Sequence, residues 1–87
     1  MNKSNGQLSP AEIESEYNAL LNGQQITQGR IQHFEEKYAM STIEFLKRFA
    51  EDEFQHSFDF DEWIGESRML NHIEEKLARL KSLSHSD

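Results

Sequence analysis

The last third of the chain has apolar residues at helical spacing. They recur at intervals of 7, 3, 4 and 3 residues and are Trp63, Leu70, Ile73, Leu77 and Leu80. This spacing gives a seam with a period of about 3.5 residues, as in helices that pack along their length. Such a helix is stable in water only against another apolar surface. The pattern therefore predicts one long helix, from Phe58 to Leu83, packed on the rest of the chain.

Three segments begin with the same local signal for a helix start. Each has an apolar residue, then a capping residue, then a glutamate three residues after the cap; the caps are Ser9, Ser41 and Asp59. Serine and aspartate oxygens accept hydrogen bonds from the unpaired N–H groups of a first helical turn, and the glutamate bonds back to the cap. At the third start, Phe58 and Trp63 are placed to pack on each other across the cap.

The remaining boundaries come from turn residues. Asn22-Gly23 predicts the end of the first helix, because glycine adopts the left-handed conformation at little cost. A second helix opens at Ile26 and runs to Tyr38, and a third ends near Glu53. No run alternates apolar and polar residues as a half-buried strand would. We therefore predict an all-α fold, a small four-helix domain with a long C-terminal helix.

A length of 87 residues fits one domain. We expect residues 1–8 to form a flexible leader, residues 9–83 a single helical domain and residues 84–87 a flexible tail. No apolar run approaches the roughly 20 residues of a membrane span, and the start lacks a signal-peptide core. The chain has no cysteine, which excludes disulfides and thiolate metal sites. A cytoplasmic protein without a membrane anchor is the expectation.

The net charge of −7 is unevenly distributed. Residues 1–66 contain 13 acidic and 5 basic residues, a net charge of −8, whereas residues 67–87 contain 3 acidic and 4 basic residues, a net charge of +1. A negative surface repels the phosphates of nucleic acids and favours a basic protein partner. Several excess charges also keep a small domain soluble, so charge alone does not decide between these roles.

The most unusual stretch is residues 51–66, where seven acidic residues are interleaved with four large aromatic ones. Aromatic side chains supply binding energy, and carboxylates select and steer a basic partner. Alternatively, the aromatic residues fill the core where the last two helices meet. Phe60 is the strongest surface candidate, because it lies between Asp59 and Asp61, where full burial is awkward. The predicted partner-binding residues are Phe54, Phe58, Phe60, Asp61, Trp63, Glu66, Ile73, Leu77 and Leu80.

Glu66 falls on the apolar seam between Trp63 and Leu70. A buried carboxylate without a partner is costly. Glu66 should therefore lie at the edge of the core or meet a basic group, which could be Arg68, Arg30 or a group of a binding partner. The last turns of the long helix should extend beyond the shorter helices. An overhanging apolar seam favours a further chain, either a second copy in a homodimer or a different protein.

Metal binding and catalysis find little support in the sequence. His33 and Glu36, like His72 and Glu75, share a helix face, but neither pair has the two-histidine spacing of a zinc helix. No glycine elbow, cysteine or phosphate-binding loop frames a nucleophile. We expect no metal, no cofactor and no catalytic residues, and hence no enzyme.

DNA binding is the alternative function. The helix that ends at Tyr38, the short turn after it and the helix that follows could form a helix-turn-helix. The recognition helix would begin with Glu44, and only Lys47 and Arg48 could contact phosphate. Nucleic acid is therefore the less favoured partner. A self-associating helical module with no other partner is the third possibility.

Three segments resemble elements of short acidic helical proteins encoded in bacterial, notably cyanobacterial, toxin–antitoxin loci: Tyr17–Gly23, Phe34–Ser41 and Phe60–Trp63. The resemblance covers roughly residues 12–80. It implies a protein that binds and neutralises a cognate basic toxin, often a ribonuclease. The separate DNA-binding segment of many antitoxins is not evident. The favoured prediction is a non-enzymatic, antitoxin-like protein-binding module.

Overall fold

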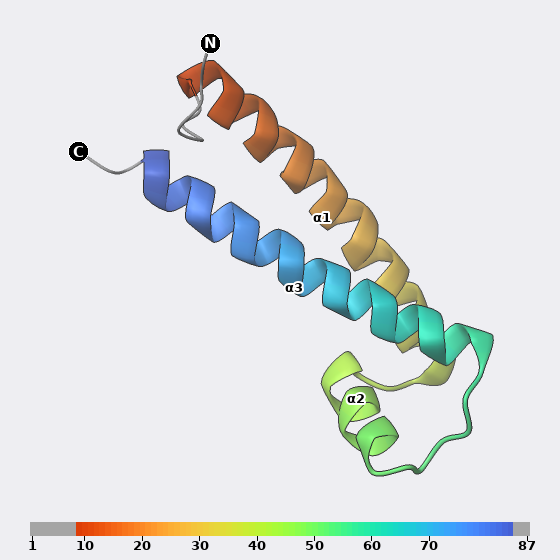
Figure 1. The fold of residues 1–87 in the computed structure, drawn as a ribbon. Coiled ribbons are helices and arrows are strands. Elements are labelled where there is room, and N and C mark those ends of the chain that lie inside the picture. Colours follow the sequence, from red (N-terminus) through yellow and green to blue (C-terminus); the bar gives the residue numbers. More distant parts are fainter. Residues whose placement is uncertain (1–8, 85–87) are drawn as a thin grey trace.

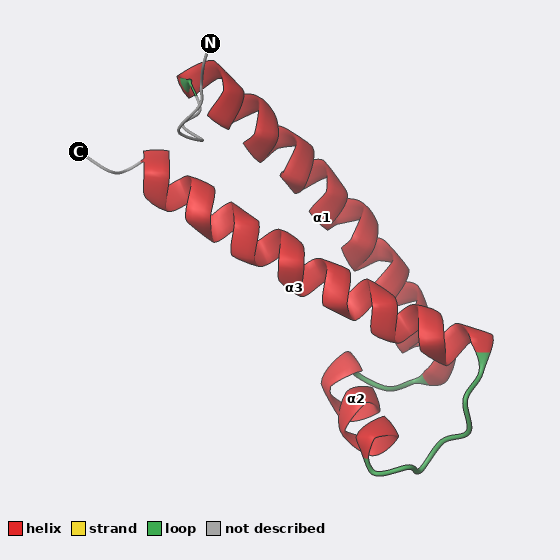
Figure 2. Cartoon of the chain, in the orientation of Figure 1, coloured by secondary structure: helices red, strands yellow, loops and turns green. Residues whose placement is uncertain are grey.

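The computed structural model describes residues 9–84 and contains three helices: α1 (Pro10–Tyr38), α2 (Thr42–Ala50) and α3 (Phe58–Ser84). The expected leader, and the expected tail apart from its first residue, lie outside the described residues. Within residues 9–84 there is no strand, which confirms the all-α prediction (Figure 2). α1 and α3 lie side by side and antiparallel, and α2 packs against the end of this hairpin where α1 stops and α3 starts (Figure 1).

The prediction of four helices was wrong, because α1 continues through Asn22-Gly23. Gly23 stays helical instead of taking the left-handed conformation that ends a helix. It faces α3, and a β-carbon placed on it would lie 3.6 Å from Cδ1 of Ile73. Glycine inside a helix costs about 1 kcal/mol relative to alanine. The packing of a continuous α1 along α3 offsets that local cost.

Two of the three predicted helix starts are confirmed. At α1, the Ser9 hydroxyl accepts from the backbone N–H of Glu12 at 3.2 Å, and the Glu12 carboxylate accepts from the backbone N–H of Ser9 at 2.8 Å. At α2, the Ser41 hydroxyl accepts from the backbone N–H of Glu44 at 3.1 Å. These caps satisfy N–H groups that have no partner within the helix.

The predicted cap of α3 was wrong by two residues. Ser57, not Asp59, is the cap, since its hydroxyl accepts from the backbone N–H of Phe60 at 3.1 Å. Phe58 is 82% exposed whereas Trp63 is fully buried, so the two do not pack across the helix start. The earlier start releases the Asp59 carboxylate for contacts with α1.

The core is densest where the three helices meet. One buried ring comes from each helix: Phe34 from α1, Phe45 from α2 and Trp63 from α3. The rings of Phe45 and Trp63 stack with their centroids 3.9 Å apart. The ring of Phe34 also stacks with Trp63, at a centroid distance of 5.6 Å. The Trp63 indole N–H donates to the Thr42 hydroxyl at 2.9 Å, so its one polar group is satisfied. This cluster fixes α2 against the hairpin.

The predicted overhang of the long helix is also wrong. α1 has 29 residues and α3 has 27, so the two helices run together to the far end, where Ile13 of α1 and Leu80 of α3 line one hollow. The molecule is elongated, with extents of 51 × 23 × 21 Å and a radius of gyration of 16.9 Å, against about 12 Å for a compact domain of this length. Among the described helices, none is both long and apolar enough to cross a membrane.

Candidate functional site

The nine residues predicted to bind a partner do not form one surface. Trp63, Ile73 and Leu80 are buried, with exposed fractions of 0%, 6% and 8%, and Leu77 is half-buried. Their side chains pack between the helices of the same chain. They stabilise the hairpin, and in this conformation the three buried ones present no surface to another molecule.

Phe54 and Phe60 belong to the rim of the aromatic core. The Phe60 ring lies 5.2 Å from Phe45, 5.3 Å from Phe54 and 5.1 Å from Tyr38, measured between centroids. Both side chains are half-buried. Phe60 is therefore a packing residue, and the exposed aromatic of this region is Phe58 instead.

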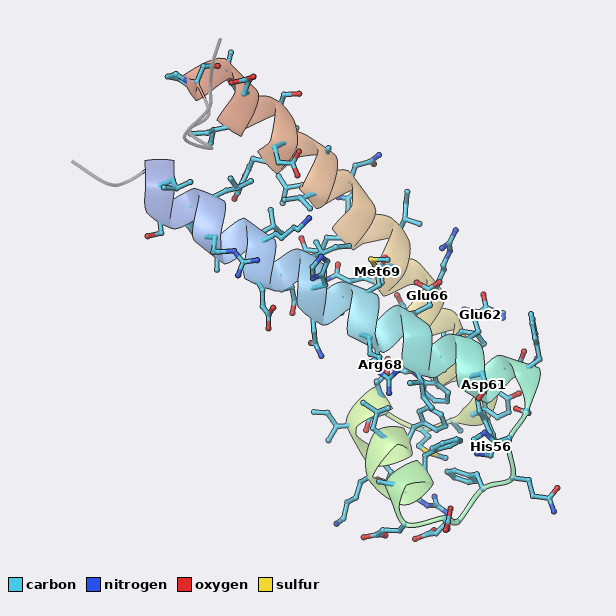
Figure 3. All side chains as sticks on the ribbon, viewed as in Figure 1. His56, Asp61, Glu62, Glu66, Arg68 and Met69 are labelled. Atoms are coloured by element: carbon cyan, nitrogen blue, oxygen red, sulfur yellow. The ribbon has the colours of Figure 1, made fainter. Side chains whose placement is uncertain are left out.

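One face of α3 is exposed from its first residue to its middle. It carries Phe58, Glu62, Gly65 and Met69, spaced as successive turns of a helix, and Met69 is 50% exposed. Figure 3 shows Glu62, Glu66 and Met69 following one another along this helix. Asp61, also exposed, lies toward the start of α3, where its carboxylate is 3.5 Å from the His56 ring nitrogen Nδ1.

A groove runs between this face of α3 and α1. It consists of two adjoining hollows that share Ile26, Arg30 and Glu62. Glycines leave it open, since a β-carbon on Gly29 or Gly65 would have no neighbour within 4 Å. We call it the glycine groove, and its lining includes Gly23, Ile26, Gly29, Arg30, His33, Asp59, Glu62, Gly65, Glu66 and Met69.

Glu66 lies where the seam reaches the glycine groove. Its side chain is 13% exposed, and its carboxylate accepts from Nη1 of Arg30 at 3.2 Å. This confirms that Glu66 meets a basic group at the edge of the core, and identifies that group as Arg30. The Arg30 side chain is 60% exposed, so solvent screens the pair and it adds little stability.

Asp59 joins the start of α3 to the end of α1. Its carboxylate accepts from the Lys37 ammonium at 2.7 Å and from the Tyr38 hydroxyl at 2.6 Å. The hydrogen bond from Lys37, followed by that from Tyr38, holds the pKa of Asp59 below its ordinary value, and the same contact raises the pKa of Lys37. No distinct signal in the sequence predicts this cluster, because an aspartate near a helix start is equally compatible with a capping role.

We expect the stability of the protein to fall when the pH drops below about 4, the range where an unfolded aspartate takes up a proton. The folded pKa of Asp59 is lower than the unfolded one, so its contribution is present above the unfolded pKa and disappears as the pH falls through the folded pKa. Urea unfolding of the Asp59→Asn variant between pH 2 and 6 should show a shallower acid slope. Asp61→Asn, at an exposed carboxylate, is the matched control, and equal slopes for Asp59→Asn and wild type would contradict this role.

The surface of α2 offers little positive charge for the DNA-binding alternative. Nε of Arg48 lies 3.0 Å from a Glu53 carboxylate oxygen, and Nη1 lies 3.8 Å from Glu44. Arg48 therefore faces two carboxylates of its own chain, and Lys47 is the other cation of this helix. Elsewhere in residues 9–84, no three histidine, aspartate or glutamate side chains are grouped to hold a metal ion.

Comparisons of the chain with protein-family models, with curated proteins and with solved structures found no match.

Proposed function

We propose that this chain is a non-enzymatic, antitoxin-like module that binds a basic protein through the exposed face of α3 and the glycine groove. The observation that carries the proposal is Phe58, an aromatic side chain 82% exposed at the start of α3, with the exposed carboxylates of Asp61 and Glu62 one turn further on. An exposed aromatic ringed by carboxylates suits a partner that combines an apolar contact with Lys and Arg side chains.

The glycine groove supports the same kind of partner. Ile26 and Met69 are about half exposed on its two sides, at 49% and 50%. Gly29 and Gly65 let a partner's backbone approach the helices closely. An amphipathic helix with basic flanks fits these features, since its apolar side can enter the groove while its charges meet Asp61 and Glu62.

Neutralisation of a toxin would follow from charge competition. A ribonuclease binds RNA phosphates with Lys and Arg side chains. The carboxylates at the start of α3 would occupy those cations and exclude RNA, and the apolar contacts would set the lifetime of the complex. Association should accordingly slow as the salt concentration rises.

The experiment is a pull-down from the native host with tagged wild-type chain and two variants, Phe58→Ala and Glu62→Lys. We expect a basic protein that is retained by wild type and released by both variants, with a loss of affinity of about tenfold or more. Ile43→Ala is the matched control, because Ile43 is an equally exposed apolar residue, at 83%, on α2. Retention by all three variants, or saturable sequence-preferring binding to duplex DNA, would contradict the proposal.

A further inference from the structure

The half of the hairpin away from α2 has a second groove. It is lined by Tyr17, Leu21 and Gln24 of α1 and by Glu74, Leu77, Ala78 and Lys81 of α3. We call it the distal groove. Within the described residues, no third helix covers it.

The distal groove lies on the same side of the hairpin as α2. On α1, Glu35 marks that side, because its carboxylate accepts from the backbone N–H and the hydroxyl of Thr42 at 2.9 and 2.8 Å. Tyr17 lies about five helical turns before Glu35, and Gln24 lies about three turns before Glu35. All three residues therefore share one face of α1. The α1 residues that are buried against α3 form a row along the helix. The distal groove lies on one side of this row, and Ile26 of the glycine groove lies on the other side. The two grooves are therefore separate surfaces.

The contacts between α1 and α3 fix which residues lie level with each other. Three such pairs are Gly23 with Ile73, Arg30 with Glu66, and Phe34 with Trp63. In every pair the two residue numbers add up to 96 or 97, as expected for antiparallel helices of equal rise. Position 19 of α1 is accordingly level with the step between Leu77 and Ala78 of α3.

Six of the seven residues that line the distal groove are arranged symmetrically about that level, and Gln24 is the exception. On α3, Glu74 and Lys81 lie at equal distances on either side of it, with Leu77 and Ala78 between them. On α1, Tyr17 and Leu21 are likewise each two residues from position 19. A two-fold axis through this level, perpendicular to the helices, would place opposite charges against each other. It would likewise place apolar residues against apolar residues.

We propose that the distal groove is an isologous interface at which two copies of this chain form an antiparallel four-helix dimer. Each Glu74 pairs with Lys81 of the second copy, and each Tyr17 packs on Leu21 of the second copy. At the axis, Leu77 of each copy lies level with Ala78 of the other. Gln24 comes opposite Glu14, where an amide can donate to a carboxylate.

The size of the contact suits a reversible dimer. The axis at position 19 places Pro10 of one copy opposite residue 28 of the other, so about 19 residues of α1 overlap, or roughly 28 Å of helix. With two helices about 20 Å wide, each copy buries about 500 Å², near the lower limit for a specific interface. The overlap stops short of Glu35, so α2 does not obstruct it. The elongated shape of the monomer, 51 Å in its longest dimension, provides this free length.

Charge exchange at the interface tests the proposal. We expect sedimentation equilibrium to show dimers at micromolar to 100 micromolar concentration, in the range of weak interfaces. Glu74→Lys and Lys81→Glu should each weaken the dimer by about tenfold, because each creates two like-charge contacts. The double variant should restore it. Arg79→Glu, an equal charge change at an exposed residue that does not line the groove, is the matched control. A monomer at 100 micromolar, or a double variant no tighter than the single ones, would overturn the proposal.

A cross-link locates the axis independently. The chain has no cysteine, so Ala78→Cys introduces a single thiol beside the proposed two-fold axis. A short bismaleimide should join two such chains. His72→Cys carries its thiol on the opposite side of α3 and should remain monomeric under the same conditions. Equal yields from both variants would exclude this axis.

Phe58→Ala should leave the dimer unchanged, so failure of the dimer and failure of the proposed partner binding are separate results.

Discussion

Replacing Trp63 with alanine is expected to lower the free energy of unfolding by about 3–5 kcal/mol. The indole is fully buried, stacks on Phe45 at 3.9 Å and lies 5.6 Å from Phe34. Its removal leaves a cavity where all three helices meet and takes away the donor to the Thr42 hydroxyl. A domain of this size has a total stability of about 4–13 kcal/mol. The variant should therefore lose a large share of the stability of the protein.

Urea unfolding followed by circular dichroism measures this loss. Phe58→Ala is the matched control, because it also removes an aromatic ring from α3, but one that is 82% exposed. We expect that control to change the stability by no more than about 0.5 kcal/mol. A Trp63→Ala variant as stable as the Phe58→Ala variant would show that the aromatic cluster does not hold α2 on the hairpin.

Replacing Gly23 with proline is expected to cost about 3 kcal/mol or more. Gly23 lies in the interior of α1, thirteen residues after the helix begins at Pro10. Proline there removes one backbone hydrogen bond, and its ring collides with the carbonyl four residues earlier. The resulting kink would also disturb the packing of α1 against Ile73. Thermal unfolding of the variant measures the cost.

Alanine at the same position distinguishes a continuous helix from a break by the sign of its effect. In a continuous helix, Gly23→Ala should stabilise the protein by about 0.5–1 kcal/mol, since its β-carbon would meet Ile73 at an ordinary contact distance of 3.6 Å. A left-handed glycine that ends a helix would give the opposite result. Destabilisation by alanine together with tolerance of proline would show that α1 is broken at this point.

The sequence predicted those parts of the fold that depend on neighbouring residues. The capping hydrogen bonds at Ser9 and Ser41 and the span of α3 follow from local signals. Gly23 was misread because an Asn-Gly pair looks the same at a helix end and inside a helix. The deciding contact is Ile73, which is fifty residues away in the chain.

The candidate site was predictable only in part, for the same reason. The pattern identified Glu66 as a carboxylate in need of a basic partner, and Arg30 was one of its candidates. The exchange of roles between Phe58 and Phe60 depends on where α2 docks, and no spacing along α3 encodes that. Asp59 and Ser57 are both acceptable caps, and the choice between them depends on Lys37 and Tyr38 at the end of α1.

The aromatic cluster anchors only one end of a hairpin that is 51 Å long. Local opening should therefore be easiest at the end where α1 begins and α3 finishes, because within residues 9–84 that end is held by two helices and the other by three. A molecule built in this way can loosen at its tip while its base remains folded. A molecule that binds at the tip would order the ends of α1 and α3 as well as contact them. The free energy spent on this ordering would reduce the free energy of binding.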